Sequence, residues 1–415
     1  MGESGKVTAV FGQHDEKTIE QLKNVASRAA YAALMADGHM GYIMPIGGVA
    51  AYRNEVSVPG VGYDIACGNA AIMTDRFIQE FDRRELELLA DEIHRTISFG
   101  VGRSNRADDA PVDHELFKSD AWSLLPADAK VSELKSKARN QLGTVGSGNH
   151  YVDVFADRAD GRIWVGVHFG SRGLGHTIAS GFLALAANAK WGQRVKESEA
   201  ILGLDAPIGQ DYWSLMNLAG QYAYAGREWV ARKVVDIIGA HEIELVHNHH
   251  NFSWAEEHFG ERLIVVRKGA TPAFPGQKGF IGGSMGDDAV IVQGASARTR
   301  TAVPGTGENQ ANALFSTVHG AGRVMSRTQA RGKTKGWGRK ARIISPGLVS
   351  QEMLDSWINE AGVILRGGGL DEAPQAYRRL PEVLAAQGDT IEVLHTLRPV
   401  IVVMAGADEF DPYKD

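Results

Sequence analysis

The sequence predicts an α+β fold in which a single large domain spans residues 1–415. Helical periodicity is confined to a few stretches, and short β-rich runs lie between them without a regular strand–helix–strand repeat. Such a repeat would instead predict a doubly wound parallel sheet. Glycine is also abundant, with 49 residues in 415, where an average protein has about 7%. We therefore expect mixed β-sheets flanked by helices, with glycine-rich loops converging on one centre.

Four stretches carry apolar residues at helical spacing and are predicted to be helices. The first follows acidic residues and ends before Asp37-Gly38, a combination typical of a helix followed by a turn. In chain order the predicted helices are Lys17–Met35, Gln79–Arg95, Ala179–Ser198 and Tyr212–Ile243. Short runs rich in β-branched and other apolar residues are predicted to be strands. They are Ala70–Thr74, Ile163–His168, Leu263–Val266, Ala289–Gln293, Ala341–Ile344 and Val400–Val403.

Two segments are expected to lie outside the regular framework. Gly102–Lys130 is polar and contains proline, so we expect a mobile excursion from the domain and not a domain boundary. Residues 407–415 form a short C-terminal tail. The composition, with 44% hydrophobic residues and no apolar run of about 18 residues, argues against a membrane-spanning helix. The N-terminus lacks the order of a signal peptide, so a cytoplasmic protein is expected.

The net charge of −6 does not by itself indicate a nucleic-acid-binding protein. The distribution of the charge is more informative than its sum, because the stretch from Arg323 to Arg342 carries basic residues and no acidic one. Such a strip could follow a phosphate backbone, since Lys and Arg gain affinity for a polyanion through counterion release. Trp337 in its middle could stack on a base. The alternative is a solvated basic loop.

Glycines cluster in short loops, and most of these loops border a residue that could bind a metal ion. The loops are Pro59–Gly62, Gly143–Gly148, Gly170–Gly173, Gly282–Gly286 and Gly320–Gly322. Glycine lets a backbone approach a ligand closely, so several such loops suggest a common centre for phosphate or metal. The candidate ligands beside them are Asp64, Cys67, His150, His168 and His250. One or two divalent ions would suit this set, and Zn²⁺ competes with Mn²⁺.

These loops belong to motifs that resemble the RtcB family of RNA ligases over Ala36–Gly406, nearly the whole chain. The matching motifs are Ala36–Gly41, Gly60–Gly68, Gly143–His150, His168–Gly173, His250-Asn251, Arg267–Ala270, Gly283–Gly286 and Ser316–Arg323. The resemblance implies an enzyme that joins an RNA 2',3'-cyclic phosphate or 3'-phosphate end to a 5'-hydroxyl end. It implies GTP and Mn²⁺ as cofactors, and broken or spliced RNA, tRNA included, as substrate. An archease-like activator is a further candidate partner.

Matched residue by residue, the resemblance implies a role for each motif. His319 falls on the histidine that becomes guanylylated, and Asp37 on an acidic position near the metals. The five candidate ligands fall on the metal ligands of the family. The implied nucleotide-binding residues are Asn149, Asp153, His250, Asn251, Gly283, Ser284, Met285, His319, Gly320, Ala321, Gly322, Arg323 and Tyr377. The candidate RNA-backbone contacts are Arg172, Arg327, Lys333, Lys335, Arg339 and Lys340.

The sequence departs from the family pattern on the side of the nucleotide base. Met404 stands where the family commonly has a lysine, and Asp153 stands for a longer glutamate. Ala289 takes the place of a serine, and Gly41-Tyr42-Ile43 replaces a Gly-Lys-Gly segment. Each lost hydrogen bond should weaken discrimination against adenine by roughly 1–3 kcal/mol.

Three alternatives to a GTP-dependent RNA ligase remain open. One is a metal-dependent hydrolase that opens cyclic phosphate ends without sealing them. Another is a divergent paralogue with relaxed nucleotide or nucleic-acid specificity. The third is a non-catalytic RNA-binding protein in which the metal is structural, so that its removal would unfold the chain.

Overall fold

A long, curved sheet forms the centre of the molecule in a computed structural model that describes residues 6–196, 198–335 and 342–406. Its strand order is β13-β14-β19-β6-β7-β5-β9, and β18 pairs with β19 in parallel while the other neighbours are antiparallel. In that order the strands are β13 (Lys278–Ile281), β14 (Ala289–Gly294), β19 (Ile391–Gly406), β6 (Tyr151–Asp157), β7 (Arg162–Phe169), β5 (Gly68–Phe77) and β9 (Glu242–His249), with β18 (Ile364–Gly368) at the side.

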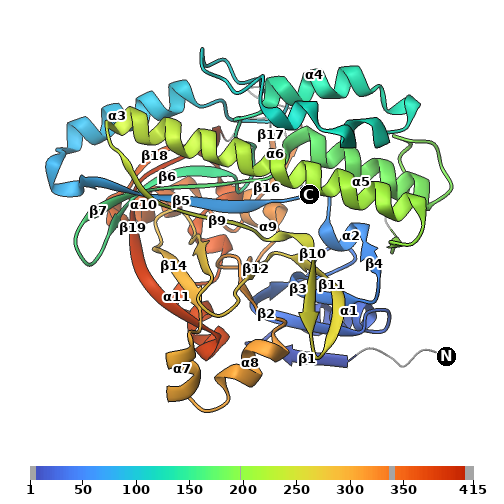
Figure 1. The fold of residues 1–415 in the computed structure, drawn as a ribbon. Helices are drawn as coiled ribbons and strands as arrows, with labels where there is room; N and C mark the ends of the chain where they lie inside the picture. Colours follow the sequence, from blue (N-terminus) through green and yellow to red (C-terminus); the bar gives the residue numbers. More distant parts are fainter. Residues whose placement is uncertain (1–5, 197, 336–341, 407–415) are drawn as a thin grey trace.

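Two helices, α3 (Arg83–Thr96) and α6 (Pro207–Ile238), cover one face of this sheet. Figure 1 shows α6 running across the molecule above β5 and β7. Ile93 and Val234 from the helices pack in one buried cluster with Ile72 and Val165 from the strands. Burying each such side chain contributes about 1.5–3 kcal/mol, which fixes the helices over the sheet.

A smaller sheet of strand order β1-β2-β3-β11-β10 lies at the lower right of Figure 1, with α1 (Glu16–Ala26) beside it. Its strands are β1 (Lys6–Val10), β2 (Tyr31–His39), β3 (Ile46–Tyr52), β11 (Glu261–Lys268) and β10 (Asn251–His258). Strands β9 and β10 follow each other directly at His250, so this residue joins the two sheets.

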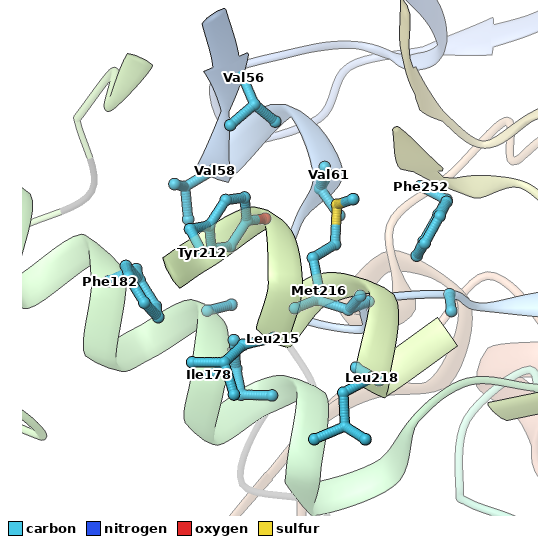
Figure 2. Close-up of a cluster of buried hydrophobic side chains, with 14 of the residues drawn as sticks. Val56, Val58, Val61, Ile178, Phe182, Tyr212, Leu215, Met216, Leu218 and Phe252 are labelled. Carbon is cyan, nitrogen blue, oxygen red and sulfur yellow. The ribbon is translucent and has the colours of Figure 1, made fainter. Parts of the chain in front are cut away.

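The space between the smaller sheet and α6 is filled by the largest buried cluster. Figure 2 shows Met216 of α6 pointing toward Val61 of α2 (Val58–Val61). The Tyr212 ring of α6 packs against the Phe182 ring of α5 (Arg172–Ala186), with centroids 5.2 Å apart. Phe252 of β10 lies on the other side of Met216 in the same view. This packing holds α2, and with it the loop that follows α2, against both α5 and α6.

Shorter elements complete the described chain. The remaining helices are α4 (Val131–Gln141), α7 (Ala297–Ala302), α8 (Thr306–Asn312), α9 (Arg327–Arg331), α10 (Gln351–Ala361) and α11 (Leu380–Gln387). The remaining strands pair two by two: β4 (Glu55–Ser57) with β8 (Ile201–Gly203), β12 (Ala270–Pro272) with β15 (Ser316–Val318), and β16 (Gly332–Lys335) with β17 (Arg342–Pro346). No helix in the described part of the chain is both long and apolar enough to cross a membrane.

The predicted α+β class is confirmed, but the bounds of all four predicted helices were wrong. The helix expected over Lys17–Met35 ends at Ala26, because Tyr31–His39 is a buried strand paired with both β1 and β3. Alanine-rich sequence favours a helix locally, yet burial between two strands outweighs that small preference. The helix expected over Gln79–Arg95 starts at Arg83, where the Asp82 side chain accepts a hydrogen bond from the backbone N–H of Glu85.

The other two predicted helices also stop early, for local reasons. The one expected over Ala179–Ser198 ends at Ala186, after which Asn188 adopts a positive φ of 56° and Trp191 packs edge-on against Phe182. The one expected over Tyr212–Ile243 ends at Gly239, whose left-handed backbone terminates α6. The predicted strands lie within β5, β7, β11, β14, β17 and β19, except that Ala341 falls outside the described residues.

The segment Gly102–Lys130 has structure of its own. It contains short 3-10 helices, and Phe117 and Trp122 from these turns are buried against α6. Its mobility stays a prediction, but part of the segment belongs to the packed body. The tail 407–415 lies outside the described residues.

Candidate functional site

The loop that carries Asp64 and Cys67 is held in an unusual conformation. It leaves α2 at Gly62, with φ of 90°, and passes through Ala66, which has a positive φ of 61°. An alanine in this region costs about 1–2 kcal/mol unless neighbours hold it. The Ala66 N–H donates to the Asn251 carbonyl at 2.7 Å, and the Ala66 carbonyl accepts from Arg227 Nη1 at 2.8 Å. Two hydrogen bonds therefore hold Ala66 in this conformation.

Three buried side chains converge at the end of this loop. Cys67 Sγ lies 3.6 Å from His150 Nε2 and 3.6 Å from His168 Nε2. The donor atoms of these residues all lie within 4.8 Å of one another. Zinc–sulfur bonds of about 2.3 Å and zinc–nitrogen bonds of about 2.0–2.1 Å would place tetrahedral ligand atoms about 3.5 Å apart. The spacing thus suits one metal ion between the three donors.

Asp64 and His250 lie at the edge of the same group. Asp64 Oδ2 is 3.1 Å from His150 Nε2. The His250 ring stacks on the His168 ring with centroids 5.1 Å apart. The sequence-predicted ligand set is therefore brought together by the fold, although its segments are far apart in the chain.

Two glycines make room for this group. A Cβ atom at Gly146 would collide with Nδ1 of His150, and one at Gly170 would collide with the carboxylate of Asp64. Any side chain at these positions would displace a candidate ligand. This close approach explains why glycine is required at one position in each of two glycine-rich loops.

A hydrogen bond sets the tautomer of His168. Asn69 Nδ2 donates to the Phe280 carbonyl at 2.7 Å, so Asn69 Oδ1 faces His168 Nδ1 at 2.6 Å and accepts its proton. The lone pair of His168 is then on Nε2, toward Cys67. Histidine ligands are commonly oriented by such a partner.

The electrostatics of the group suit a cation. Burial lowers the pKa of His168 and of His250 well below the ordinary value, so both imidazoles are neutral. Burial raises the pKa of the Cys67 thiol well above its ordinary value, and the charge of Asp64 raises it further. Burial also opposes ionisation of Asp64, but contacts with His150 outweigh it and leave its pKa lowered. A bound divalent ion would deprotonate the thiol.

His319 lies next to this group, beyond His250. The two rings meet edge to face with centroids 4.9 Å apart. His319 Nδ1 is 2.6 Å from Asp37 Oδ2, and the same oxygen accepts from the backbone N–H of His319 at 3.0 Å. Asp37 is fully buried, so it holds one side of the ring and leaves Nε2 as the available nitrogen. A carboxylate that holds one ring nitrogen in this way leaves the other free to act as a nucleophile or as a ligand.

The loop after His319 wraps around Asp37. The Gly320 N–H lies 3.3 Å from Asp37 Oδ2, and Gly322, with φ of 72°, passes so close to the Asp37 carbonyl that a Cβ would not fit. Ala321 is buried between them. These residues fix the position of Asp37 relative to His319.

Arg323 and Tyr377 belong to a polar network on the far side of this loop. Arg323 Nη1 donates to Tyr377 Oη at 2.8 Å and lies 3.1 Å from Glu372 Oε2. Tyr377 Oη also donates to Glu372. Arg327 completes the network through ion pairs with Asp371 and Glu372.

The predicted base-side residues line β6, β19 and the turn before β14. Asp153 is buried; the Val403 N–H donates to its carboxylate, but Oδ1 has no hydrogen-bond partner within the described chain. Burial raises the pKa of Asp153 well above its ordinary value. Met404 is paired with Tyr151 across β19 and β6, and both pack with Met285.

The remaining predicted nucleotide contacts are placed as follows. Asn149 Nδ2 lies 3.5 Å from His168 Nε2, beside the candidate metal ligands. Asn251 Oδ1 accepts from the Gly269 N–H at 2.7 Å. Ser284, which follows Gly283, donates to Asp287 Oδ2 at 2.8 Å.

The predicted RNA-backbone residues of the described structure come from separate elements, α5, α9 and β16. Arg172 lies at the metal side, within 3.4 Å of Thr144 Oγ1, and has a positive φ of 55°. Arg327 is held in the Asp371–Glu372 network. Lys333 is exposed on β16, and Lys335 ends that strand. Arg339, Lys340 and Trp337 lie outside the described residues. Their role in RNA binding stays a prediction.

The sequence reasoning missed several residues that organise the site. Asn69 is a polar residue in an apolar strand, and Arg227 is a charge among the buried residues of α6. Asp371 and Glu372 are buried carboxylates. For Asn69 and Arg227 a polar side chain inside an apolar pattern was the available signal, because buried polar groups are paired.

The fold and the site define an α+β protein in which a buried cysteine and histidines can hold a metal ion beside a carboxylate-held histidine. Comparison with known families agrees: residues 19–405 match the model described as tRNA-splicing ligase RtcB. The chain belongs to the RtcB family.

Curated relatives are similar over most of their length. The "tRNA-splicing ligase RtcB" of Thermococcus kodakarensis is 30% identical, over 89% of this chain and 86% of the relative. The protein of the same name from Nanoarchaeum equitans is 30% identical, over 94% and 92%. The "RNA-splicing ligase RtcB" of Escherichia coli strain K12 is 30% identical, over 92% and 93%.

Proposed function

We propose that this protein is an RNA ligase that joins a 2',3'-cyclic phosphate or 3'-phosphate end to a 5'-hydroxyl end. It uses GTP and Mn²⁺, acts in tRNA splicing or RNA repair, and works in the cytoplasm. Family membership and the names of the relatives support the ligase class. The observation that carries the proposal is the contact between His319 and Asp37, beside the Cys67–His150–His168 group.

His319 is the proposed nucleophile. The Nδ1–H group of His319 keeps its proton and is hydrogen-bonded to Asp37. The Nε2 lone pair attacks the α-phosphorus of GTP, an N–P bond forms, and pyrophosphate leaves. The ring of the adduct carries a positive charge, which the buried carboxylate of Asp37 stabilises in a low-dielectric setting. The Gly320 N–H, also directed at Asp37, keeps the carboxylate in place.

The guanylate then moves to RNA. An oxygen of the RNA 3'-phosphate attacks the guanylate phosphorus, the N–P bond breaks, and His319 regains its lone pair. The 5'-hydroxyl attacks the RNA 3'-phosphorus, GMP leaves, and the hydroxyl proton is lost to solvent or to a nearby base. A cyclic phosphate end must first be opened by water.

The residues present fit a divalent ion. Nδ1 of His150 and Nδ1 of His250 are buried and have no hydrogen-bond partner among the described residues, and the donor set combines one thiol with two imidazoles. Cys67, His150 and His168 would hold the ion, with Asp64 and His250 at the edge. When bound, it would neutralise charge that develops on the phosphoryl oxygens. The donor set also suits Zn²⁺.

The choice of base is the part of the proposal that departs from the family. Met404 and Ala289 are both buried and offer no hydrogen bond to a base. Phosphate and metal contacts are on the other side, at His319 and the histidine ligands. We therefore propose nucleotidyl transfer with a GTP-over-ATP preference smaller than is usual in the family.

Intact-mass measurement tests the proposal. The protein is incubated with Mn²⁺ and each of the four nucleoside triphosphates, with His319→Ala as the matched control. The expected result is a mass increase equal to a nucleoside monophosphate, largest with GTP and absent in His319→Ala. No adduct with any nucleotide, together with opening of cyclic phosphate ends, would favour the hydrolase instead. Metal removal that unfolds the chain, with His319 dispensable, would favour a non-catalytic RNA-binding protein.

A further inference from the structure

Arg227 of α6 is a fully buried arginine without a carboxylate partner in the described structure. Its Nη1 donates to the Ala66 carbonyl at 2.8 Å and to the Phe169 carbonyl at 2.6 Å. Its Nε donates to His247 Nε2 at 2.9 Å, and its Nη2 lies 2.8 Å from His249 Nδ1. A buried cation is costly unless its N–H groups are paired, and here two carbonyls and two imidazoles pair them.

These acceptors lie on the segments that carry the candidate metal ligands. Ala66 precedes Cys67 in the loop with the strained backbone. Phe169 follows His168 at the end of β7, and His249 precedes His250 at the end of β9. One guanidinium therefore connects segments from three different parts of the chain, each at the residue next to a ligand.

Both imidazole partners are arranged as acceptors. Burial lowers the pKa of His247 to about 3, so this ring is neutral. Arg227 Nη2 can only donate, so His249 Nδ1 is the acceptor of their hydrogen bond. Glu228 lies 3.5 Å from His247 Nδ1 and accepts its proton, which leaves Nε2 free to accept from Arg227. Tyr224 stacks on the His249 ring with centroids 3.8 Å apart. The surroundings thus hold each acceptor in the orientation that Arg227 requires.

We propose that Arg227 is a positioning residue that sets the geometry of the metal centre by tying the Cys67 loop, the end of β7 and the end of β9 together. The inference rests on the proposed metal centre. Arginine suits this role because its planar fork presents five donors in fixed directions. Lysine has three donors at one point and cannot reach all of these acceptors. Arg227 does not contact the ion or the substrate.

A second buried arginine provides the control. Arg267 of β11 is also fully buried, but it pairs with the Glu256 carboxylate at 2.7 Å and with Ser316 Oγ at 2.8 Å. None of its hydrogen-bond partners adjoins a candidate metal ligand. Arg267→Lys therefore disturbs the core to a similar degree without touching the three ligand segments.

The test is a Co²⁺ titration without nucleotide, followed through the absorption bands of thiolate-bound and imidazole-bound Co²⁺. Arg227→Lys should bind Co²⁺ about 10–100-fold more weakly, the usual effect of losing a group that orients ligands, with shifted bands. Arg267→Lys should lower the melting temperature but keep the wild-type affinity and bands. Wild-type Co²⁺ binding in Arg227→Lys would overturn the proposal, as would an equal loss in Arg267→Lys.

A second variant covers the case in which Arg227→Lys does not fold. His249→Phe removes one acceptor and keeps an aromatic ring against Tyr224 and Phe252. A smaller loss of Co²⁺ affinity in the same direction supports the proposal, and wild-type affinity overturns it. Failure of the wild-type chain to bind Co²⁺ would count instead against the metal centre of the proposed function.

Discussion

The metal side and the base side of the site are built differently. On the metal side, His168 is oriented by Asn69, and the Cys67 loop is fixed through Ala66. On the base side, Asp153 Oδ1 has no hydrogen-bond partner in the described part of the chain, and Met404 offers none. Hydrogen bonds thus fix a loop and a ligand ring on the metal side, whereas on the base side the apolar Met404 stands where a side chain could have contacted a base.

This difference separates two tasks. A metal ion and a nucleophile tolerate little displacement, so the residues that carry them must be fixed before substrate arrives. A base pocket can lose a contact and still bind, with less discrimination. We therefore expect changes on the metal side to abolish the reaction and changes on the base side to alter the choice of nucleotide.

The largest effect is expected at Cys67. Cys67→Ser replaces a thiolate by a poorly ionised hydroxyl. The affinity for the metal ion should therefore fall by at least about 100-fold, while the fold stays near wild type. Elemental analysis and circular dichroism check the two parts of this expectation. Unchanged metal content in a folded variant would remove Cys67 from the centre.

Met404→Lys should sharpen the contrast from the base side. Met404 is opposite Tyr151, and Asp153 lies two residues along on the same face of β6, so a lysine there has a carboxylate within reach. The restored donor should increase the GTP-over-ATP preference of adduct formation by about 1–3 kcal/mol. Competition between the two nucleotides, read by intact mass, measures it. An unchanged ratio would show that position 404 does not face the base.

Substitutions in the basic stretch Arg323–Arg342 should weaken RNA binding and leave both sides of the nucleotide site unchanged. Replacing Lys333, Lys335 and Lys340 by alanine should lower the slope of log affinity against log salt by about 0.7 per residue for single-stranded RNA. Adduct formation should be unaffected, because loading of His319 needs no RNA. RNA binding at several salt concentrations provides the measurement. If the slope stays at its wild-type value, the strip is not an RNA surface.

A further effect is expected in the pH dependence of stability on the base side. Because burial raises the pKa of Asp153, the unfolded chain releases this proton at a lower pH than the folded chain, near 3.9. Stability is then lost as pH rises above that value, by at most about 1.4 kcal/mol per pH unit. At pH 4 the melting temperature of Asp153→Asn should equal that of the wild type. As the pH rises toward neutral, the melting temperature of the variant should exceed that of the wild type by an increasing amount. Equal melting temperatures at neutral pH would show that folding does not raise the pKa of Asp153.

Much of the site could be predicted from local sequence. Glycines beside Asp64, His150 and His168 indicated loops that let backbone approach a ligand closely, and such loops depend on residue type alone. The same holds for the α+β class, since the order of apolar patterns along the chain carries it. The family motifs then assigned a nucleophile to His319.

Only the tertiary structure decided how these residues are held. Tyr31–His39 is a strand although its alanines favour a helix, because pairing on both sides buries it. Arg227 and Asn69 acquire their roles through contacts with residues far away in the chain, such as Ala66, and no local pattern encodes such distances. Periodicity and residue type act over a few neighbours, whereas burial and hydrogen-bond pairing are settled when distant segments meet.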